Sequence, residues 1–512
     1  MRLKQGLGDD AFADSKKIRF AMVIVTILAI LFFAWVVYPA KFYFLNDDFI
    51  HIPLAAKGNF IFGSFVRPIG DLSLWVVNKI WDRNSFGYHL SNIIVHLGNS
   101  MLVYFLSKAL LSLYTDGKNI PLKSWAAAMI FLVYAFHSEP VLWIIGRSGS
   151  LSAFFFLLSC IFYLKRKSGL FYFLISIFSF IAALLTYESS WVFPLFVLLI
   201  SYADVRLKDN KWKTERVYPL VTISIFFTFL FCLKNIAGEA FTEYSGYNFV
   251  HLNLPRLFLN YQSLIARTYL PYLDNSAIFA ILYCSTILVG IGLVFFLKKQ
   301  KRSNPLLWIA IVLFLVSPLP EVSLGISTHN SESERYVYLP SVFFILLFVE
   351  ILFQLIKSKI RSLIISILYI LLQCCLLYVS AISYNFAGNV VRKSLNSINS
   401  HSSAKIIYLI NRPIQCNGAL MFRAGFKNAL DWICPDLNYS RIDTISSLSY
   451  TRDRTFSVYE LNLENGLNVI HNMTTRRNNE DFQINICGKV FSFDHGKDMI
   501  LYWNDSSFIQ IK

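Results

Sequence analysis

The chain consists largely of apolar runs close to 20 residues long, separated by short polar segments. A helix needs about 20 consecutive apolar residues to cross the hydrocarbon core of a membrane. The pattern therefore predicts about eleven transmembrane helices. We expect them at residues 20–38, 88–113, 124–143, 148–164, 169–187, 189–204, 217–233, 276–297, 305–320, 336–356 and 361–384.

Composition supports a membrane protein rather than a soluble one. Hydrophobic residues make up 55% of the 512 residues, aromatic residues 16% and charged residues 15%. The formal net charge of +16 would suit a nucleic-acid-binding protein if the charge formed one patch. The basic residues instead stand in short clusters between the apolar runs, as they do at the inner ends of membrane helices. We therefore expect no nucleic-acid partner.

The basic clusters also predict the topology. With residues 1–19 in the cytoplasm, the inner connections are short yet hold more Lys and Arg residues than the longer outer connections. This bias is the one that orients membrane proteins. We expect a multi-pass protein of a bacterial inner membrane, or of the endoplasmic reticulum membrane in a eukaryote, with its site on the periplasmic or lumenal face.

The expected domains are a cytoplasmic N-terminus at 1–19, a transmembrane domain at 20–384 and an extracytoplasmic domain at 385–512. After residue 385 polar residues become common, and segments such as 455–461 and 499–503 favour β-strands. The expected fold class is an all-α polytopic membrane protein with a small C-terminal α/β or β-rich domain.

Two predicted outer segments are more than simple links. The first outer loop, 39–87, and the segment 255–271 mix aromatic, aliphatic and charged residues. This mixture is typical of helices that lie in the membrane interface.

An acidic pair, Asp47-Asp48, stands just beyond the first apolar run. Carboxylates are costly in hydrocarbon, so such a pair at the mouth of a membrane helix is a candidate functional site. Three further polar clusters fall on the same predicted face. They are His137-Ser138-Glu139 with Arg147, Glu188 within Tyr187-Glu188-Ser189, and Glu332, Glu334 and Arg335 followed by Tyr336. Each cluster alone is also explained by a helix-end ion pair, whereas four on one face indicate a site.

The residue types suit transfer of a sugar from a lipid phosphate to a hydroxyl group. The reaction needs a base to take the proton of the acceptor, which Asp or Glu can do. It also needs a cation to hold the departing phosphate, and the forked donors of Arg suit that role. The candidates are Asp47 and Asp48 as catalytic residues, and Arg335 and Arg147 as ligands of the donor phosphate.

Several motifs follow one another in order along the chain. They are Phe49, Arg67-Pro68, Gly87-Tyr88-His89-Leu90-Ser91-Asn92-Ile93-Ile94-Val95-His96, His137-Ser138-Glu139-Pro140-Val141 with Gly146-Arg147, and Arg335-Tyr336-Val337-Tyr338-Leu339-Pro340-Ser341. Together they resemble the membrane part of the transmembrane O-mannosyltransferases that modify cadherins, and more broadly the GT-C glycosyltransferases. The resemblance covers roughly residues 45 to 345.

This resemblance implies a polyprenyl-phosphate sugar donor and an inverting transfer, on the outer face, to a hydroxyl of a protein, glycan or lipid acceptor. It implies that the acidic pair supplies the catalytic carboxylates, with Asp47 matching the leading acid. Substrate-binding or supporting roles are expected for Arg67, His89, His96, His137, Glu139, Glu188, Glu334 and Tyr336.

The chain departs from the family pattern in two places. Tyr187 stands where the family has a Lys before Glu188, which removes any donor contact by that lysine. The tail shows no tetratricopeptide repeats, so the way the family recognises a protein acceptor does not carry over.

Other chemistries stay open as alternatives. His89 and His96 are seven residues apart, but no carboxylate or Cys stands at metal-ligand spacing beside them, so a packing role is preferred. No cofactor is indicated, and a divalent metal ion is an open alternative. The other functions to consider are a transporter or flippase for a lipid-linked glycan, and a non-catalytic glycan-assembly protein. A transporter should show pseudo-repeated halves and broken midplane helices, and the sequence shows no such repeat.

Overall fold

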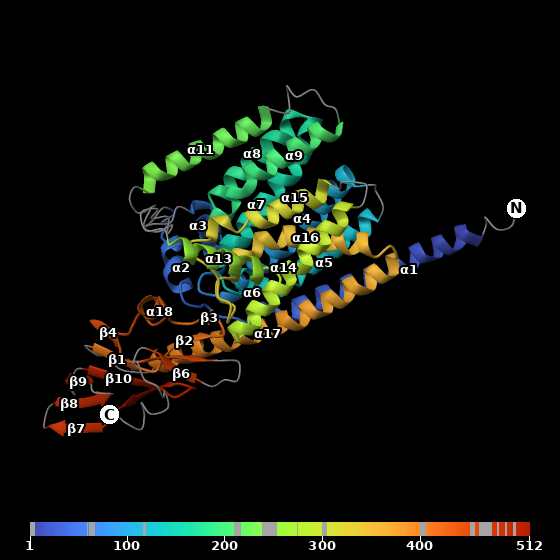
Figure 1. Cartoon of the computed structure of the whole chain (residues 1–512). Coiled ribbons are helices and arrows are strands. Elements are labelled where there is room, and N and C mark those ends of the chain that lie inside the picture. The colour runs from blue at the N-terminus through green and yellow to red at the C-terminus, as the bar shows by residue number, and fades with distance from the viewer. Residues whose placement is uncertain are drawn as a thin grey trace.

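The computed structural model describes residues 6–58, 60, 67–115, 119–208, 217–237, 253–273, 275–299, 305–399, 406–450, 456–459, 474–478, 481–486, 489–494 and 498–511. These residues form a bundle of helices with a small strand-containing domain at one end (Figure 1), which confirms the expected fold class. The α-helices are α1 (Gly6–Val36), α2 (Asp48–Ala56), α3 (Pro68–Trp81), α4 (Ser85–Tyr114), α5 (Ile120–Leu132), α6 (Ser138–Leu142), α7 (Arg147–Leu164), α8 (Leu170–Leu184), α9 (Phe193–Lys208), α11 (Val217–Ala237), α13 (Leu254–Arg267), α14 (Ser276–Lys299), α15 (Pro305–Val316), α16 (Tyr338–Leu355), α17 (Lys359–Asn399) and α18 (Phe426–Ile433).

The number of full-length spans is smaller than the sequence suggests. Among the described residues, 7 helices are long and apolar enough to cross a membrane, or 8 if one bent pair counts as a span. The other three predicted spans coincide with the shorter apolar helices Leu170–Leu184, Val217–Cys232 and Pro305–Glu321. At about 1.5 Å per residue, α8 with 15 residues and α15 with 12 residues are shorter than a hydrocarbon core of about 30 Å, whereas α11 has 21 residues over its full length. The eleven predicted spans thus correspond, among the described residues, to seven full-length helices, one bent pair and three shorter apolar stretches.

The bent pair is the predicted span 124–143. Its two parts, Ile120–Leu132 and Ala135–Leu142, meet at 54°. The break frees backbone groups that a continuous helix would satisfy, and side chains of other helices replace those bonds. The amide of Ala135 donates to Oε1 of Gln373 in α17 at 3.0 Å. The break therefore lies inside the protein, where its polar groups have partners.

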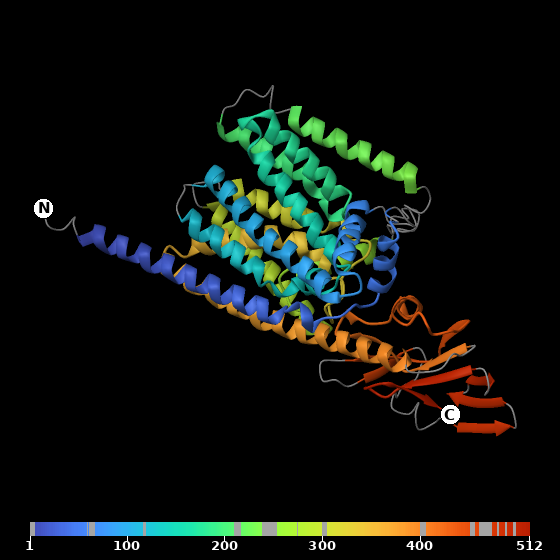
Figure 2. The ribbon, with the colours of Figure 1, turned by 180° about the vertical axis from the view of Figure 1, so that it is seen from behind.

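Helices α1 and α17 run side by side in the same direction along one flank of the bundle (Figures 1 and 2). Trp35 stacks on Tyr378, with ring centroids 5.5 Å apart. Further along, a Cβ on Gly388 would lie 3.0 Å from the backbone nitrogen of Tyr43, so glycine allows the two segments to approach closely. Helix α17 continues to Asn399, beyond the predicted end of the span at 384, and carries the chain directly into the C-terminal domain.

The C-terminal domain is built from short strands and helix α18. The strands are β1 (Ile406–Ile410), β2 (Arg412–Cys416), β3 (Ala419–Leu420), β4 (Arg441–Thr444), β5 (Ser447–Tyr450), β6 (Phe456–Tyr459), β7 (Thr474–Asn478), β8 (Asp481–Ile486), β9 (Lys489–Asp494), β10 (Asp498–Trp503) and β11 (Phe508–Ile511). They form sheets of order β11-β10-β1-β4, β3-β2-β5-β6 and β7-β8-β9. Strand β1 pairs in parallel with both β10 and β4. The predicted strand segment 455–461 contains β6, and the predicted strand segment 499–503 lies within β10.

Candidate active site

The acidic pair lies at a sharp corner of the chain, between a short 3₁₀ turn (Pro39–Lys41) and helix α2. Asn46 has a φ of 46°, a left-handed conformation that Asn adopts more readily than most residues. At this corner the two aspartates have different surroundings: Asp48 is fully buried and Asp47 is partly exposed.

Asp48 is held by the backbone. One carboxylate oxygen accepts from the amide of Leu45 at 2.8 Å, and the other accepts from the amide of Ile145 at 3.0 Å. Burial raises the pKa of Asp48 well above its ordinary value, although the two amides act in the opposite direction. This carboxyl group therefore ties the corner to the segment before α7, and it has no open side toward an acceptor.

Asp47 is the accessible member of the pair. Its Oδ1 accepts from the side-chain nitrogen of Asn46 at 2.9 Å. The amide of His51, one helical turn later, donates to the carbonyl of Asp47 at 2.9 Å. Burial lowers the pKa of His51, and the nearby charge of Asp47 opposes that shift. Asp47 thus combines a fixed backbone with a carboxylate that solvent or a ligand can reach.

The C-terminal domain holds this corner from the other side. The amide of Asn46 donates to the carbonyl of Met421 at 2.7 Å, and Oδ1 of Asn46 accepts from the amide of Ala424 at 2.7 Å. Gly425, at a φ of 73°, leaves room for the contact, since a Cβ there would lie 2.6 Å from the carbonyl oxygen of Asn46. The backbone of the acidic corner is therefore fixed by two domains at once.

Glu139 and Arg335 form an ion pair at the centre of the site. Nη1 of Arg335 lies 2.5 Å from Oε1 of Glu139, and the backbone amide of Arg335 donates to Oε2 at 2.9 Å. The side chain of Glu139 is 2% exposed and that of Arg335 is 23% exposed. The guanidinium also donates to the hydroxyl of Tyr336 at 2.8 Å and lies 5.4 Å from the ring centroid of Trp143. Arg335 is therefore anchored on a carboxylate while part of its side chain stays exposed.

Trp143 links this ion pair to the acidic corner. Its indole Nε1 donates to the carbonyl of Leu45 at 3.3 Å, while its ring lies beside the guanidinium of Arg335. The turn that follows Trp143 depends on Gly146, where a Cβ would lie 2.4 Å from the carbonyl oxygen of Glu139. The motif that joins Glu139 to Gly146 is thus explained by close packing.

A second ion pair extends the site. Nη2 of Arg67 lies 2.9 Å from Oε2 of Glu188, with side chains 17% and 29% exposed. The guanidinium also lies over the ring of Tyr187, 4.2 Å from its centroid. Tyr187, which stands at the position of the family's lysine, therefore supports the cation supplied by Arg67.

Arg147 has mostly intramolecular partners. Its Nε donates to Oδ1 of Asn92 at 2.8 Å, and its other nitrogens reach the carbonyl of Tyr88 and the hydroxyls of Ser91 and Ser73. Its side chain is buried. These contacts tie helices α3, α4 and α7 together, a geometry that suits positioning better than phosphate binding.

Glu334 has a partner that sequence reasoning missed. Its Oε1 lies 2.6 Å from Nη2 of Arg267, and its other oxygen accepts from the hydroxyl of Ser138. Arg267, at the end of the amphipathic helix α13, is fully buried and also donates to the carbonyl of Ser327 at 3.0 Å. The pair braces the segment that carries Arg335. In the sequence, Arg267 is one arginine on a predicted interfacial helix, and the sequence alone does not tell whether its side chain faces water or protein.

The predicted histidines lie in the core next to the site. His96 contacts the hydroxyl of Tyr338 at 2.7 Å and the carbonyl of Leu132 at 2.9 Å, and His137 contacts the hydroxyl of Ser341 at 2.8 Å. His89 is buried, 5.6 Å from the ring centroid of Phe42. In the part of the chain that the structure describes, no group of three His, Cys, Asp or Glu side chains is arranged to hold a metal ion. These histidines join motifs that are far apart in sequence.

Two more acidic groups near the site were missed. Asp71 on α3 lies close enough to Arg67 to be influenced by its charge, and burial raises the pKa of Asp71 to about 6. Glu321 is 1% exposed and lies within electrostatic range of Arg67, Glu188 and Arg335. Neither residue belongs to a motif. Glu321 follows an apolar run, where a charged residue is usually interpreted as the end of a helix.

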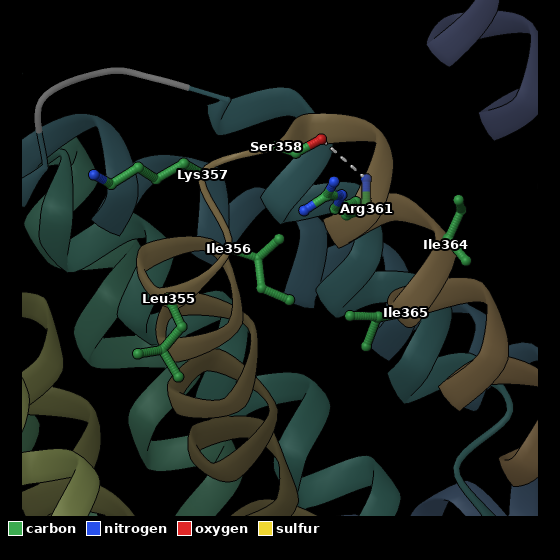
Figure 3. A pocket seen from close by; sticks show the side chains of 7 residues that line it. All are labelled: Leu355, Ile356, Lys357, Ser358, Arg361, Ile364 and Ile365. Carbon is green, nitrogen blue, oxygen red and sulfur yellow. Dashed lines mark hydrogen bonds between the residues drawn. The ribbon is translucent and has the colours of Figure 1, made fainter.

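A cavity of about 770 Å³ lies away from all of these groups, at the connection between α16 and α17 (Figure 3). Its lining includes Lys357, Ser358 and Arg361, and the amide of Arg361 donates to Oγ of Ser358 at 3.4 Å. This connection is at the opposite end of α17 from the C-terminal domain (Figure 1). None of the predicted site residues lines this cavity.

Comparison with known proteins gives partial sequence matches. No family model matches the chain. A 101-residue segment, 20% of this chain and 14% of the relative, is 32% identical to Protein O-mannosyl-transferase F38B6.6 of Caenorhabditis elegans. A 102-residue segment is 34% identical to Protein O-mannosyl-transferase TMTC2 of Mus musculus, and a 117-residue segment is 34% identical to TMTC4 of Homo sapiens. The match thus spans well under a fifth of the length of these relatives.

Two solved structures align with most of the chain, at low identity. ArnT from Cupriavidus metallidurans bound to undecaprenyl phosphate aligns with a TM-score of 0.44 at 10% identity, covering 84% of this chain and 92% of that chain. The Archaeoglobus fulgidus oligosaccharyltransferase in complex with Zn and sulfate aligns with a TM-score of 0.43 at 11% identity, covering 82% and 62%. The sequence matches confirm the expected resemblance: over about a fifth of its length the chain is similar to protein O-mannosyl-transferases.

Proposed function

We propose that this protein transfers a sugar from a polyprenyl-phosphate donor to a hydroxyl group of an acceptor, with inversion at the anomeric carbon. The observation that carries the proposal is that Trp143 links the corner bearing an accessible carboxylate to a partly exposed arginine. Asp47 is fixed by its backbone and partly exposed, and Arg335 is anchored by Glu139 while its side chain is 23% exposed. A base and a phosphate ligand are the two groups that this reaction requires.

The reaction balances with these groups alone. The acceptor oxygen attacks the anomeric carbon while its proton passes to Asp47. The bond from the anomeric carbon to the phosphate oxygen breaks, and the electron pair leaves with the phosphate, whose negative charge Arg335 holds. A single displacement of this kind inverts the configuration. In many enzymes, fixed charges that stabilise the charge developing in the transition state make the largest contribution to the rate enhancement.

The other predicted residues take supporting roles in this proposal. Arg67, paired with Glu188, supplies a second cation at the rim, while Arg147 positions the helices around the acidic corner. Glu334 with Arg267, and the buried histidines, hold the segment that presents Arg335. We place the site on the outer face, with residues 385–512 as an extracytoplasmic domain. The bias of basic residues toward the other face supports this placement.

The test compares Asp47→Asn with Asp48→Asn in purified, folded protein supplied with polyprenyl-phosphate sugars. Asn keeps the shape of Asp47 but does not accept a proton, and loss of a general base costs about 100- to 10,000-fold in rate. Binding of the donor should survive, since the phosphate ligand lies elsewhere. Asp48→Asn should instead lower stability, because both carboxylate oxygens of Asp48 accept from backbone amides.

The control is the thermal unfolding of each variant, which separates loss of chemistry from loss of fold. Near-normal turnover in both variants would rule out the acidic pair as catalytic, and absence of transfer by the wild type would favour a transporter of lipid-linked glycans. Loss in a stable Asp48→Asn alone would keep the enzyme and exchange the roles of the two aspartates.

A further inference from the structure

Glu321 is a buried carboxylate for which the described residues offer no hydrogen bond. Its residue is 1% exposed, and neither Oε1 nor Oε2 has a hydrogen-bond partner among the described residues. Its own backbone amide lies nearby but donates to the carbonyl of Pro318 at 3.2 Å. Burying a polar group without a partner costs about 2–7 kcal/mol in an apolar environment. A buried polar group without a partner in a native structure needs an explanation, and a ligand that supplies the missing hydrogen bonds is one.

Glu321 belongs to the site by its surroundings. The short 3₁₀ turn that it ends, Leu319–Glu321, packs against the turn that begins at Glu188. The charges of Arg67 and Arg335 act on it, as does that of Glu188, and Glu321 in turn acts on Tyr336. It therefore lies on the same side of the bundle as both ion pairs.

The two neighbouring cations already have carboxylate partners. Arg67 is bound to Glu188 at 2.9 Å and Arg335 to Glu139 at 2.5 Å, so Glu321 is a third carboxyl group beside two cations. Burial without a partner favours the neutral form of Glu321, which donates through its O–H and accepts through its other oxygen. A sugar hydroxyl also donates and accepts, so it matches this group, whereas a phosphate is better held by the two guanidinium groups.

We propose that Glu321 binds hydroxyl groups of the donor sugar, and that it helps the enzyme to choose which sugar it accepts. This inference rests on the proposed function, since it assumes a sugar attached to the lipid phosphate held by Arg335. Glu321 is then a specificity-determining residue that leaves the chemistry to Asp47. A site built to hydrogen-bond a sugar hydroxyl rejects a ligand that lacks it, because its own polar group is then left unpaired.

The experiment measures binding of two kinds of lipid to purified protein in nanodiscs. One is undecaprenyl phosphate, and the other is a panel of its mannosyl, glucosyl and galactosyl phosphodiesters, from which the tightest ligand of the wild-type protein is taken. Glu321→Ala should weaken binding of that sugar-lipid by about 10-fold, the equivalent of one to two ordinary hydrogen bonds. Its affinity for undecaprenyl phosphate should stay within about twofold. Asp443→Ala, which removes a partly exposed carboxylate bound to Arg441 at 2.7 Å in the C-terminal domain, is the control and should change neither affinity.

A stability measurement separates binding from a structural role. Glu321→Leu removes an unpartnered buried carboxyl group, so its thermal unfolding temperature should equal or exceed that of the wild type, while sugar-lipid affinity falls. A lower unfolding temperature with an equal loss for both lipids would show that Glu321 is structural and overturn the inference. Unchanged sugar-lipid affinity in Glu321→Ala would also overturn it.

The outcome for the wild-type protein tests the proposed function separately. If the wild type binds neither undecaprenyl phosphate nor any of its sugar phosphodiesters, the proposed function fails and Glu321 has no donor to recognise. If the wild type binds a sugar phosphodiester and Glu321→Ala binds it equally well, the proposed function stands and the role of Glu321 is refuted.

Discussion

Replacing Arg335 by Met should unfold the site and abolish transfer, and a second substitution should restore only the fold. Glu139 is 2% exposed, and its carboxylate depends on the guanidinium of Arg335 at 2.5 Å and on the Arg335 amide at 2.9 Å. Without the guanidinium, a buried carboxylate keeps only the amide, and breaking a buried pair in this way costs about 3–5 kcal/mol. In Arg335→Met combined with Glu139→Gln, the neutral amide oxygen still accepts from the backbone. The loss should then shrink to about 1 kcal/mol, the size of one ordinary hydrogen bond.

The assay is equilibrium unfolding in mixed detergent micelles, measured alongside sugar transfer. Both the single and the double variant should be inactive, because neither retains a guanidinium for the phosphate. Arg335→Lys should stay impaired as well, since a point charge does not replace two-pronged donors. The reasoning would be refuted if the double variant recovered transfer, because Arg335 would then serve only as the structural partner of Glu139.

Three further outcomes are expected. Gly425→Ala should reduce transfer, because the added Cβ would collide with the carbonyl oxygen of Asn46. The control is Gly58→Ala, which has a similar φ of 79° but open space around it and should cost only the backbone strain, about 1–2 kcal/mol. Equal effects of the two variants on transfer would contradict the role of the Gly425 contact. The pKa of Asp71, raised to about 6 by burial, predicts that the unfolding free energy falls as pH rises from about 4 to 6, because the folded state holds the proton more tightly; Asp71→Asn should flatten that slope. Reporter fusions after residues 123, 216 and 302 should report the cytoplasm and a fusion after residue 400 the outside, and a cytoplasmic signal at 400 would overturn the one-sided site.

The transmembrane architecture was predictable because each span is a local signal. A run of apolar residues identifies a membrane helix without knowledge of its neighbours. The lengths of the helices were less predictable than their positions. Helix α8 is apolar but only 15 residues long, so the number of predicted spans, about eleven, exceeds the number of full-length apolar helices among the described residues. The strands β6 and β10 were likewise local signals in the tail.

The partners within the site were less predictable. Arg335 and Glu139 were both candidates, but their pairing joins segments 196 residues apart. Arg267 sits on an amphipathic helix, and its burial depends on the side of that helix that faces the bundle. A supporting role was expected for His96, whereas Tyr338 was named only as part of a motif, and the hydrogen bond between them now gives a physical reason for both motifs.

The contact between Asn46 and Ala424 also sets a time at which the site can first exist. The two residues are 378 positions apart, so the acidic corner emerges from the ribosome long before the domain that fixes it. At about 5–20 residues per second, the gap is on the order of tens of seconds. During that interval Asp47 follows a finished membrane helix but lacks the hydrogen bonds that hold its backbone. Assembly of the acidic corner, which carries the proposed base, therefore waits for residues made long after it, and a nascent chain that lacks Ala424 has an incomplete corner.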